Sequence, residues 1–220
     1  MNSQMEIDAT IKTPCTIGVF ASRGAGKSVF VKNLLLNQNR LIFPIFKRVV
    51  WIYKHYQENL FQELKTNFDG DLIFENELPN FNQIEKQENT CFIIDDFMTE
   101  LTNSNDVNEL YVNGRHLNIS LITLSQNMFN KGRYTRTMNL NTDYCVIFEN
   151  IRDATIIKTL SYQMYPHNIN FLQEAFEDAI KQPFGHLFIE LKPNSYKPTR
   201  VRGNIFNYKD KLVVYVPVKK

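Results

Sequence analysis

Eight residues near the N-terminus, ASRGAGKS at positions 21 to 28, have the composition of a phosphate-binding loop. In such a loop, backbone N–H groups and a helix N-terminus surround the phosphates, a lysine neutralises them, and a serine hydroxyl holds Mg²⁺. The usual pattern has glycine where this chain has Ala21, which a strand end accommodates if its φ is negative. The alternative is an ordinary glycine turn before a helix. We predict an ATP-binding loop in which Lys27 contacts the β and γ phosphates and Ser28 binds Mg²⁺, formed by Ser22, Arg23, Gly24, Ala25, Gly26, Lys27 and Ser28.

Two carboxylates end a later apolar run, CFIIDD at positions 91 to 96. A strand here would deliver both acids to the sheet edge that carries the phosphate loop, with one further strand between the two motifs in the sequence. We expect Asp95 to bind Mg²⁺, directly or through water, and Asp96 to polarise the attacking water. Many hydrolysing P-loop ATPases have glutamate at the second position, and Asp96 is one methylene shorter.

A polar group ends another apolar run, NISLITLSQN at positions 118 to 127. We expect Gln126 to reach between the γ phosphate and the attacking water; the alternative is a polar residue that merely starts a loop. A strand placed between the aspartate strand and the loop strand distinguishes hydrolysing motors from P-loop small-molecule kinases, so this order of strands in the sheet would favour a motor.

The elements that must position these residues are short apolar runs alternating with helical patterns. Strands are predicted at 15–21, 48–54, 90–95, 118–125 and 144–150, with helices at 27–38, 56–67, 152–164 and 169–181. Runs that are apolar throughout are typical of strands covered on both faces by helices, so the fold class is α/β, RecA-like, with a mostly parallel sheet. Further strands at 186–191, 200–206 and 211–218 should extend one edge. We expect one domain over 1–220, with an N-terminal extension at 1–12 and a strand-rich C-terminal extension at 185–220.

Composition narrows the class of protein. None of the apolar runs is long enough for a membrane-spanning helix, and the N-terminus lacks the apolar core of a signal peptide, so we expect an intracellular protein without a membrane partner. Cys15, Cys91 and Cys145 lack metal-ligand spacing and are expected to be buried, reduced thiols. The net charge is −5 for residues 1–110 and +7 for residues 111–220, so the second half could face a polyanion.

A family resemblance rests on five stretches in this order: ASRGAGKS, FIIDDFM, GRHLNISLITLSQNMF, RTMNLNTDYCVIFENIRD and TRVRGNIF. Together they resemble the DNA-packaging ATPases of virophages and polinton-like viruses, in the FtsK-HerA branch of P-loop ATPases. The resemblance covers roughly residues 12 to 218. It implies a RecA-like core, a homo-oligomeric ring (pentamer or hexamer), and ATP-driven pumping of double-stranded DNA into a preformed capsid at its vertex. The location implied is the cytoplasmic viral factory of an infected host, and the virion.

The resemblance also suggests an arginine finger, a guanidinium that stabilises charge on the γ phosphate. Arg115, in GRH, falls on a suitable position, acting on the neighbouring subunit, and Arg152 and Arg136 compete with it. An ion pair or a DNA phosphate contact is the alternative for each. Arg23 is a fourth cation within reach of the phosphates, with no assigned role.

A basic segment, NKGRYTRTMN at positions 130 to 139, is the candidate for contacting DNA. It places Lys131, Arg133 and Arg136 around Tyr134 in a predicted loop, and a translocase needs cations that grip phosphates without reading bases. A basic loop between subunits is the alternative. Two rival functions remain open: a P-loop small-molecule kinase, and a nucleotide-switched scaffold that docks on the capsid without hydrolysis.

Overall fold

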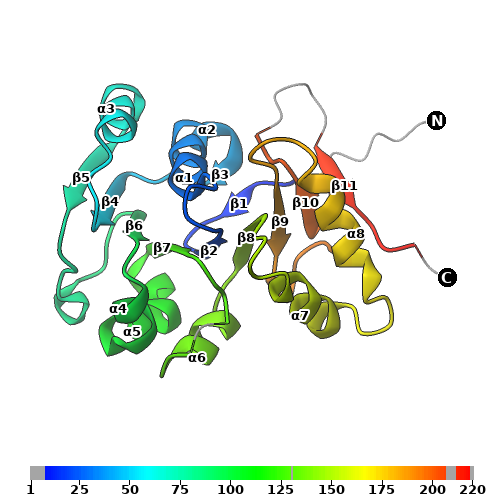
Figure 1. Cartoon of the computed structure of the whole chain (residues 1–220). Coiled ribbons are helices and arrows are strands. Elements are labelled where there is room, and N and C mark those ends of the chain that lie inside the picture. The colour runs from blue at the N-terminus through cyan, green and yellow to red at the C-terminus, as the bar shows by residue number, and fades with distance from the viewer. Residues whose placement is uncertain (1–7, 130, 207–211, 219–220) are drawn as a thin grey trace.

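A nine-stranded sheet forms the centre of the protein (Figure 1). The computed structural model describes residues 8–129, 131–206 and 212–218. The order across the sheet is β11-β10-β9-β8-β2-β7-β6-β4-β5. The bounds are β2 Thr16–Phe20, β4 Arg48–Tyr53, β5 Asp71–Glu75, β6 Thr90–Asp95, β7 Ile119–Ser125, β8 Tyr144–Phe148, β9 His186–Glu190, β10 Val201–Gly203 and β11 Val213–Tyr215.

The sheet is parallel from β5 to β8 and antiparallel from β8 to β11. The α/β class with a mostly parallel sheet is therefore confirmed, and so is its extension at one edge by the C-terminal strands. The predicted strand at 200–206 is shorter than expected, since the chain turns after Gly203. Lys211, the first residue of the last predicted strand, lies outside the described residues.

The position of β7 between β2 and β6 matters most for the site. β7 pairs in parallel with both neighbours, with Ser125 beside Phe20 and Leu124 beside Asp95. The carboxyl ends of the three strands therefore meet at one edge of the sheet, where open α/β sheets bind their ligands.

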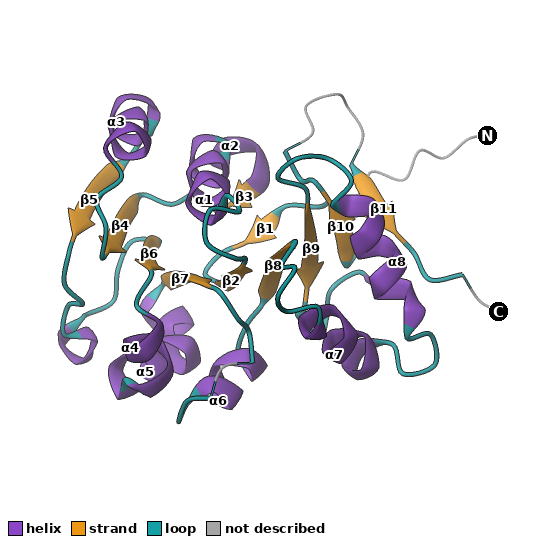
Figure 2. Cartoon of the chain, viewed as in Figure 1, coloured by secondary structure: helices purple, strands orange, loops and turns teal. Residues whose placement is uncertain are grey.

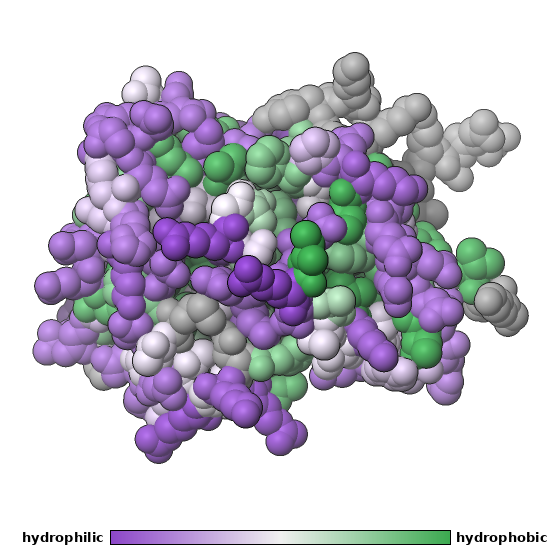
Figure 3. Space-filling view, in the orientation of Figure 1, coloured by the Kyte–Doolittle hydropathy of each residue, from purple (hydrophilic) through white to green (hydrophobic). Residues whose placement is uncertain are grey.

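Helices cover both faces of the sheet (Figure 2). One face carries α1 Lys27–Leu36, α2 Gln38–Leu41 and α3 Glu58–Asn67, and the other carries α4 Met98–Asn103, α5 Asn105–Asn113, α6 Thr135–Leu140, α7 Thr155–Met164 and α8 Asn170–Ala179. Short 3₁₀ helices occupy Phe81–Gln83, Gly114–Leu117 and Lys197–Thr199. Figure 3 shows a mostly hydrophilic surface on the viewed face, with apolar residues gathered to the right of centre.

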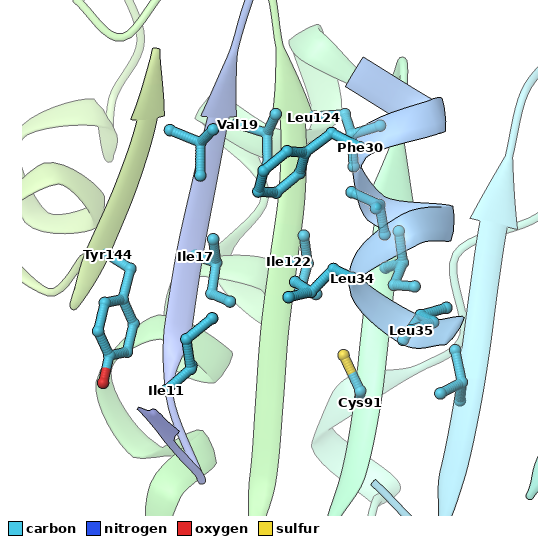
Figure 4. Packing of buried hydrophobic residues seen from close by; sticks show 14 of the residues in the cluster. Ile11, Ile17, Val19, Phe30, Leu34, Leu35, Cys91, Ile122, Leu124 and Tyr144 are labelled. Atoms are coloured by element: carbon cyan, nitrogen blue, oxygen red, sulfur yellow. The ribbon is translucent and has the colours of Figure 1, made fainter. Parts of the chain in front are cut away.

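Alternate residues of the strands enter separate cores above and below the sheet. In β2, for example, Ile17 and Val19 face the α1 side, and Phe20 joins the cluster formed with α7 and α8. A third cluster joins α4 and α5 to β4, β6 and β7. Figure 4 shows Phe30 and Leu34 of α1 lying over the central strands, which fixes the helix that follows the phosphate loop.

Two features depart from the predicted element order. β3 Ile42–Phe43 and β5 were not expected, so β3, β4 and β5 all separate the phosphate loop from the aspartate strand in the sequence, and the prediction of one intervening strand was wrong. β5 is an edge strand whose residues are half-exposed, which hides the usual apolar run. In addition, β1 Ile11–Lys12 pairs with β3 Ile42–Phe43 in a separate two-stranded parallel sheet, so the end of the predicted N-terminal extension packs on the domain.

The three cysteines are buried and free, as predicted. Burial raises the pKa of Cys15 to about 12 and raises the pKa of Cys91 and Cys145 as well. Among the residues that the structure describes, none of the helices has the length and apolar character needed to cross a bilayer.

Candidate nucleotide site

The loop between β2 and α1 has the backbone conformation that its glycines permit. Gly24 and Gly26 have φ values of 78° and 98°, a region that residues with a Cβ rarely adopt. Ala21 is absent from the residues with positive φ, and its N–H donates to the Ser125 carbonyl at 3.1 Å, continuing the β2–β7 ladder. Alanine therefore fits at this position because it is a strand end.

The start of α1 can receive an anion. Gly26 caps the helix without a side-chain hydrogen bond, and the first turn has no acidic residue. The N–H groups of that turn and the helix dipole favour negative charge there. The Lys27 ammonium donates to the Ala21 carbonyl at 2.7 Å and the Ser22 carbonyl at 3.1 Å. Burial lowers the pKa of Lys27, while Asp95 and Asp96 favour its charged form.

Oxygen atoms suited to a divalent cation lie beside the loop. The Ser28 hydroxyl donates to Asp95 Oδ2 at 3.1 Å, and Asp95 is buried, with 7% of its surface exposed. Burial raises the pKa of Asp95, whereas Ser28 and Lys27 favour its ionised form. Mg²⁺ takes oxygen ligands, commonly one or two carboxylates together with substrate phosphates, so this donor set fits it.

A glutamine that the sequence did not single out completes this network. Gln57, which precedes α3, donates through Nε2 to Ser28 Oγ at 3.1 Å and to Asp95 Oδ2 at 3.4 Å. It follows β4, a parallel strand of the same sheet. The available signal was the general tendency of such strands to deliver polar residues to one edge.

Asp96 lies beside the buried carboxylate but is half-exposed. Its φ is 66°, a left-handed conformation that aspartate adopts more readily than most residues and that is enriched at functional sites. Its Oδ2 is 3.9 Å from Nε2 of His55, another residue that sequence reasoning missed. Its carboxylate therefore lies near His55 in the same hollow as Ser28 and Asp95, and it remains accessible to water.

A single hollow of about 430 Å³ connects these groups. Gln126, the residue after β7, is exposed and lines it, so its side chain faces the same space as the two aspartates. The lining residues are Arg23, Gly24, Gly26, Lys27, Ser28, Val29, His55, Gln57, Asp95, Asp96 and Gln126.

The predicted arginines occupy different edges of the sheet. Arg23 lines the hollow, and the exposed Arg152 follows β8 at the same edge. Arg115 lies in the 3₁₀ helix before β7, at the opposite, amino edge, where its Nη2 is 3.7 Å from Asp143 Oδ1. It cannot reach the phosphates of its own chain, and the ion-pair alternative is present in the structure.

The second half of the basic segment is helical, whereas a loop was predicted. Asn130 lies outside the described residues, but α6 begins at Thr135, so the prediction of a loop was wrong for Arg136. Buried Met138 packs this helix against the core. Lys131, Arg133 and Arg136 are all exposed.

Comparison with solved structures places the fold. The structure of the genome packaging NTPase B204 from Sulfolobus turreted icosahedral virus 2, in complex with AMPPCP, matches with a TM-score of 0.54 and 12% identity over 93% of this chain and 98% of that one. Its complex with ATP-gammaS gives 0.53. The cytoplasmic domain of the type VII secretion ATPase EccC from Thermomonospora curvata gives 0.50 and 15% identity, covering 92% of this chain and 25% of that one.

The chain described here has a P-loop ATPase fold. No protein-family model matches the chain, and no curated protein matches it. At these identities the likeness concerns the fold.

Proposed function

We propose that this protein is an ATP-driven translocase that packages double-stranded viral DNA into a preformed capsid. The observation that carries the ATPase part is the position of β7 between β2 and β6, with Gln126 at its end facing the hollow that Lys27, Asp95 and Asp96 line. This arrangement favours a hydrolysing motor over a small-molecule kinase. The likeness to a genome packaging NTPase over nearly the full length of both chains supports the packaging part.

The chemistry follows from the roles of the side chains. The loop N–H groups and Lys27 bind and orient the triphosphate. To reach the phosphates, the Lys27 ammonium exchanges its hydrogen bonds to the Ala21 and Ser22 carbonyls for bonds to phosphate oxygens. Asp96 accepts a hydrogen bond, and then the proton, from the water that attacks the γ phosphorus, and Gln126 orients that water. As the new bond to phosphorus forms, the bond from the γ phosphorus to the β–γ bridging oxygen breaks, so ADP and inorganic phosphate leave. Ser28 and Asp95 would hold Mg²⁺, which neutralises charge on the phosphate oxygens.

The position of Arg115 suits an arginine finger that acts on the nucleotide of a neighbouring subunit. Because this guanidinium lies at the amino edge of the sheet and the nucleotide hollow lies at the carboxyl edge, a ring that apposes these edges would bring Arg115 to a neighbour's γ phosphate. Arg152 and Arg136 remain competing candidates. Mixing Arg115→Ala subunits with wild type should reduce activity more steeply than the mutant fraction, whereas a linear loss would exclude the role.

DNA would be held by the exposed cations that follow β7. Lys131, Arg133 and Arg136 are spaced along one short segment, and the Arg133 guanidinium lies 5.2 Å from the centre of the Tyr134 ring. Such contacts neutralise phosphates without reading sequence. The proposal includes a pentameric or hexameric ring at the capsid vertex, within the cytoplasmic viral factory of the host and retained in the virion.

The decisive experiment measures ATP hydrolysis with and without double-stranded DNA at several salt concentrations. We expect stimulation by DNA, loss of turnover by roughly 10²-fold or more for Lys27→Ala and Asp96→Asn, and weaker stimulation at high salt. Lys32→Ala is a matched control, since Lys32 lies on the same helix but pairs with Glu63 at 2.6 Å. Hydrolysis indifferent to DNA at every salt concentration would refute translocation, and ATP bound but never hydrolysed would favour the scaffold alternative.

A further inference from the structure

We propose that a second hollow beside the phosphate loop binds the nucleobase, and that Phe184 is the platform on which the base stacks. This inference rests on the proposed function, because a base subsite requires a nucleotide whose phosphates occupy the loop. The side chains to which the proposed chemistry gives a role, Lys27, Ser28, Asp95, Asp96 and Gln126, all line the first hollow and not the second. None of them accounts for the residues of the second.

The second hollow adjoins the first and has the size of a ligand site. Its volume is about 470 Å³, within the range of roughly 300–1,000 Å³ typical of small-molecule pockets. Arg23 and Gly24 line both hollows, so the two spaces meet at the phosphate loop. The remaining walls come from the end of β8 with the turn that follows, including Phe148 and Ile151, and from residues 180–185.

Phe184 is held in a position that ordinary packing does not explain. The residue is 71% exposed, although exposing a large ring to water is unfavourable, and its φ is 60°, a strained value for a bulky residue. Its ring lies against the phosphate loop, since a Cβ added to Gly26 would be 3.0 Å from Phe184 Cδ1. An aromatic face is therefore presented at the junction of loop and hollow.

One close packing contact and two hydrogen bonds fix the backbone around Phe184. Gly185 packs so closely that an added Cβ would lie 2.3 Å from the Ala179 carbonyl oxygen. Asn204 clamps the two ends of the segment: its Nδ2 donates to the Ala179 carbonyl at 3.1 Å, and its Oδ1 accepts from the His186 N–H at 3.1 Å. Asn204 belongs to the TRVRGNIF stretch, none of whose residues has a role in the proposed hydrolysis of ATP.

A preorganised aromatic face, an apolar neighbour and adjacent phosphate ligands together suit a nucleoside. Ile151 is 91% exposed and lines the same hollow, so it can cover part of a base that Phe184 supports. Every base has a π face, so stacking contributes affinity without choosing among bases. We therefore expect this subsite to strengthen binding of ATP and GTP alike.

The test compares a nucleotide with its phosphate chain alone. Binding of Mg²⁺–ATP and of Mg²⁺–tripolyphosphate is measured by calorimetry for wild type, Phe184→Asn and Phe184→Trp. Asparagine tolerates the left-handed backbone but removes the ring, and tryptophan keeps an aromatic face. Loss of base stacking should weaken ATP binding by about 5- to 100-fold and leave tripolyphosphate binding unchanged. Phe184→Trp should retain ATP affinity within a few-fold.

Each other outcome counts against a specific part of the reasoning. Equal ATP affinity for wild type and Phe184→Asn would overturn the subsite. An equal loss of ATP and tripolyphosphate would also overturn it, because Phe184 would then act only by shaping the loop at Gly26. A wild-type protein that binds neither ligand would refute the proposed ATPase function itself. Tyr162→Gln, at a 53%-exposed aromatic of α7, is the control for removing a surface ring.

Discussion

The stability of the protein should fall in mild acid because of one buried histidine. His186 is 4% exposed, and its ring lies among those of Phe30, Phe148 and Phe206, at centroid distances of 4.9, 5.3 and 5.7 Å. Within the part of the chain that the structure describes, its Nε2 has no hydrogen-bond partner. Burial disfavours a positive charge on this ring more strongly than the Phe184 carbonyl, 3.4 Å from Nδ1, favours it, so the neutral form is preferred in the folded protein.

The magnitude follows from the shift of the titration. Burial lowers the pKa of His186 from 6.5 to about 4. Above pH 6.5 the ring is neutral in both states, and the site costs nothing. Between pH 6.5 and 4 the unfolded chain binds a proton that the folded protein does not, so the free energy of unfolding decreases by about 1.4 kcal/mol per pH unit, or about 3 kcal/mol in total.

The substitution His186→Phe should remove this acid sensitivity while keeping an aromatic ring in the cluster. Urea unfolding of wild type and variant at pH 7.0, 5.5 and 4.0 gives the difference directly, because the other titrating groups are common to both proteins. We expect wild type to lose about 3 kcal/mol more than the variant over this interval. His167→Phe, at an exposed histidine, is the control for replacing a histidine by phenylalanine outside the core. Parallel curves for wild type and His186→Phe would refute the assignment.

Three further substitutions test the loop, the metal site and the C-terminal strands. Ala21→Gly should leave ATP turnover within about twofold and cost about 0.5–1 kcal/mol of stability, since a glycine at a strand end adds only backbone freedom; a large gain in turnover would show that the alanine impairs the loop. Gln57→Leu should raise the Mg²⁺ concentration needed for half-maximal ATPase activity by about tenfold or more, as loss of a group orienting metal ligands does; an unchanged Mg²⁺ titration would contradict this role. Arg202→Ala should lower the free energy of unfolding by about 3–5 kcal/mol. The Arg202 guanidinium is 2% exposed and lies 2.7 Å from the Glu190 carboxylate, so its removal would leave that carboxylate unpaired. A loss below 1 kcal/mol in urea unfolding would contradict this expectation.

The central strands could be predicted because each contains a run of buried, mostly apolar residues without the alternation of a half-exposed strand. β6, for instance, is buried at every position from Thr90 to Asp95. β5 could not, because an edge strand meets water on one side and needs no continuous apolar run. The pairing of β1 with β3 joins two-residue strands far apart in the sequence, and no local pattern marks such strands.

The same distinction holds in the site. Lys27 and Asp95 belong to motifs whose residue types carry their own chemistry, and the parallel sheet brings them together. Gln57 has no motif, and its importance depends on distances of 3.1 to 3.4 Å to oxygens of two other elements. Phe184 was missed for a related reason: its significance lies in a positive φ and a contact with Gly26, which exist only in the folded chain.

The three buried cysteines make the protein convenient for counting subunits with dyes. Maleimide reagents attack the thiolate, and burial both hides these sulfur atoms and keeps them protonated. A cysteine introduced at an exposed position, for example Tyr162→Cys, would therefore take up the label while the native thiols remained unmodified. Stepwise photobleaching of singly labelled chains would then give the number of subunits in an assembly without rebuilding the core.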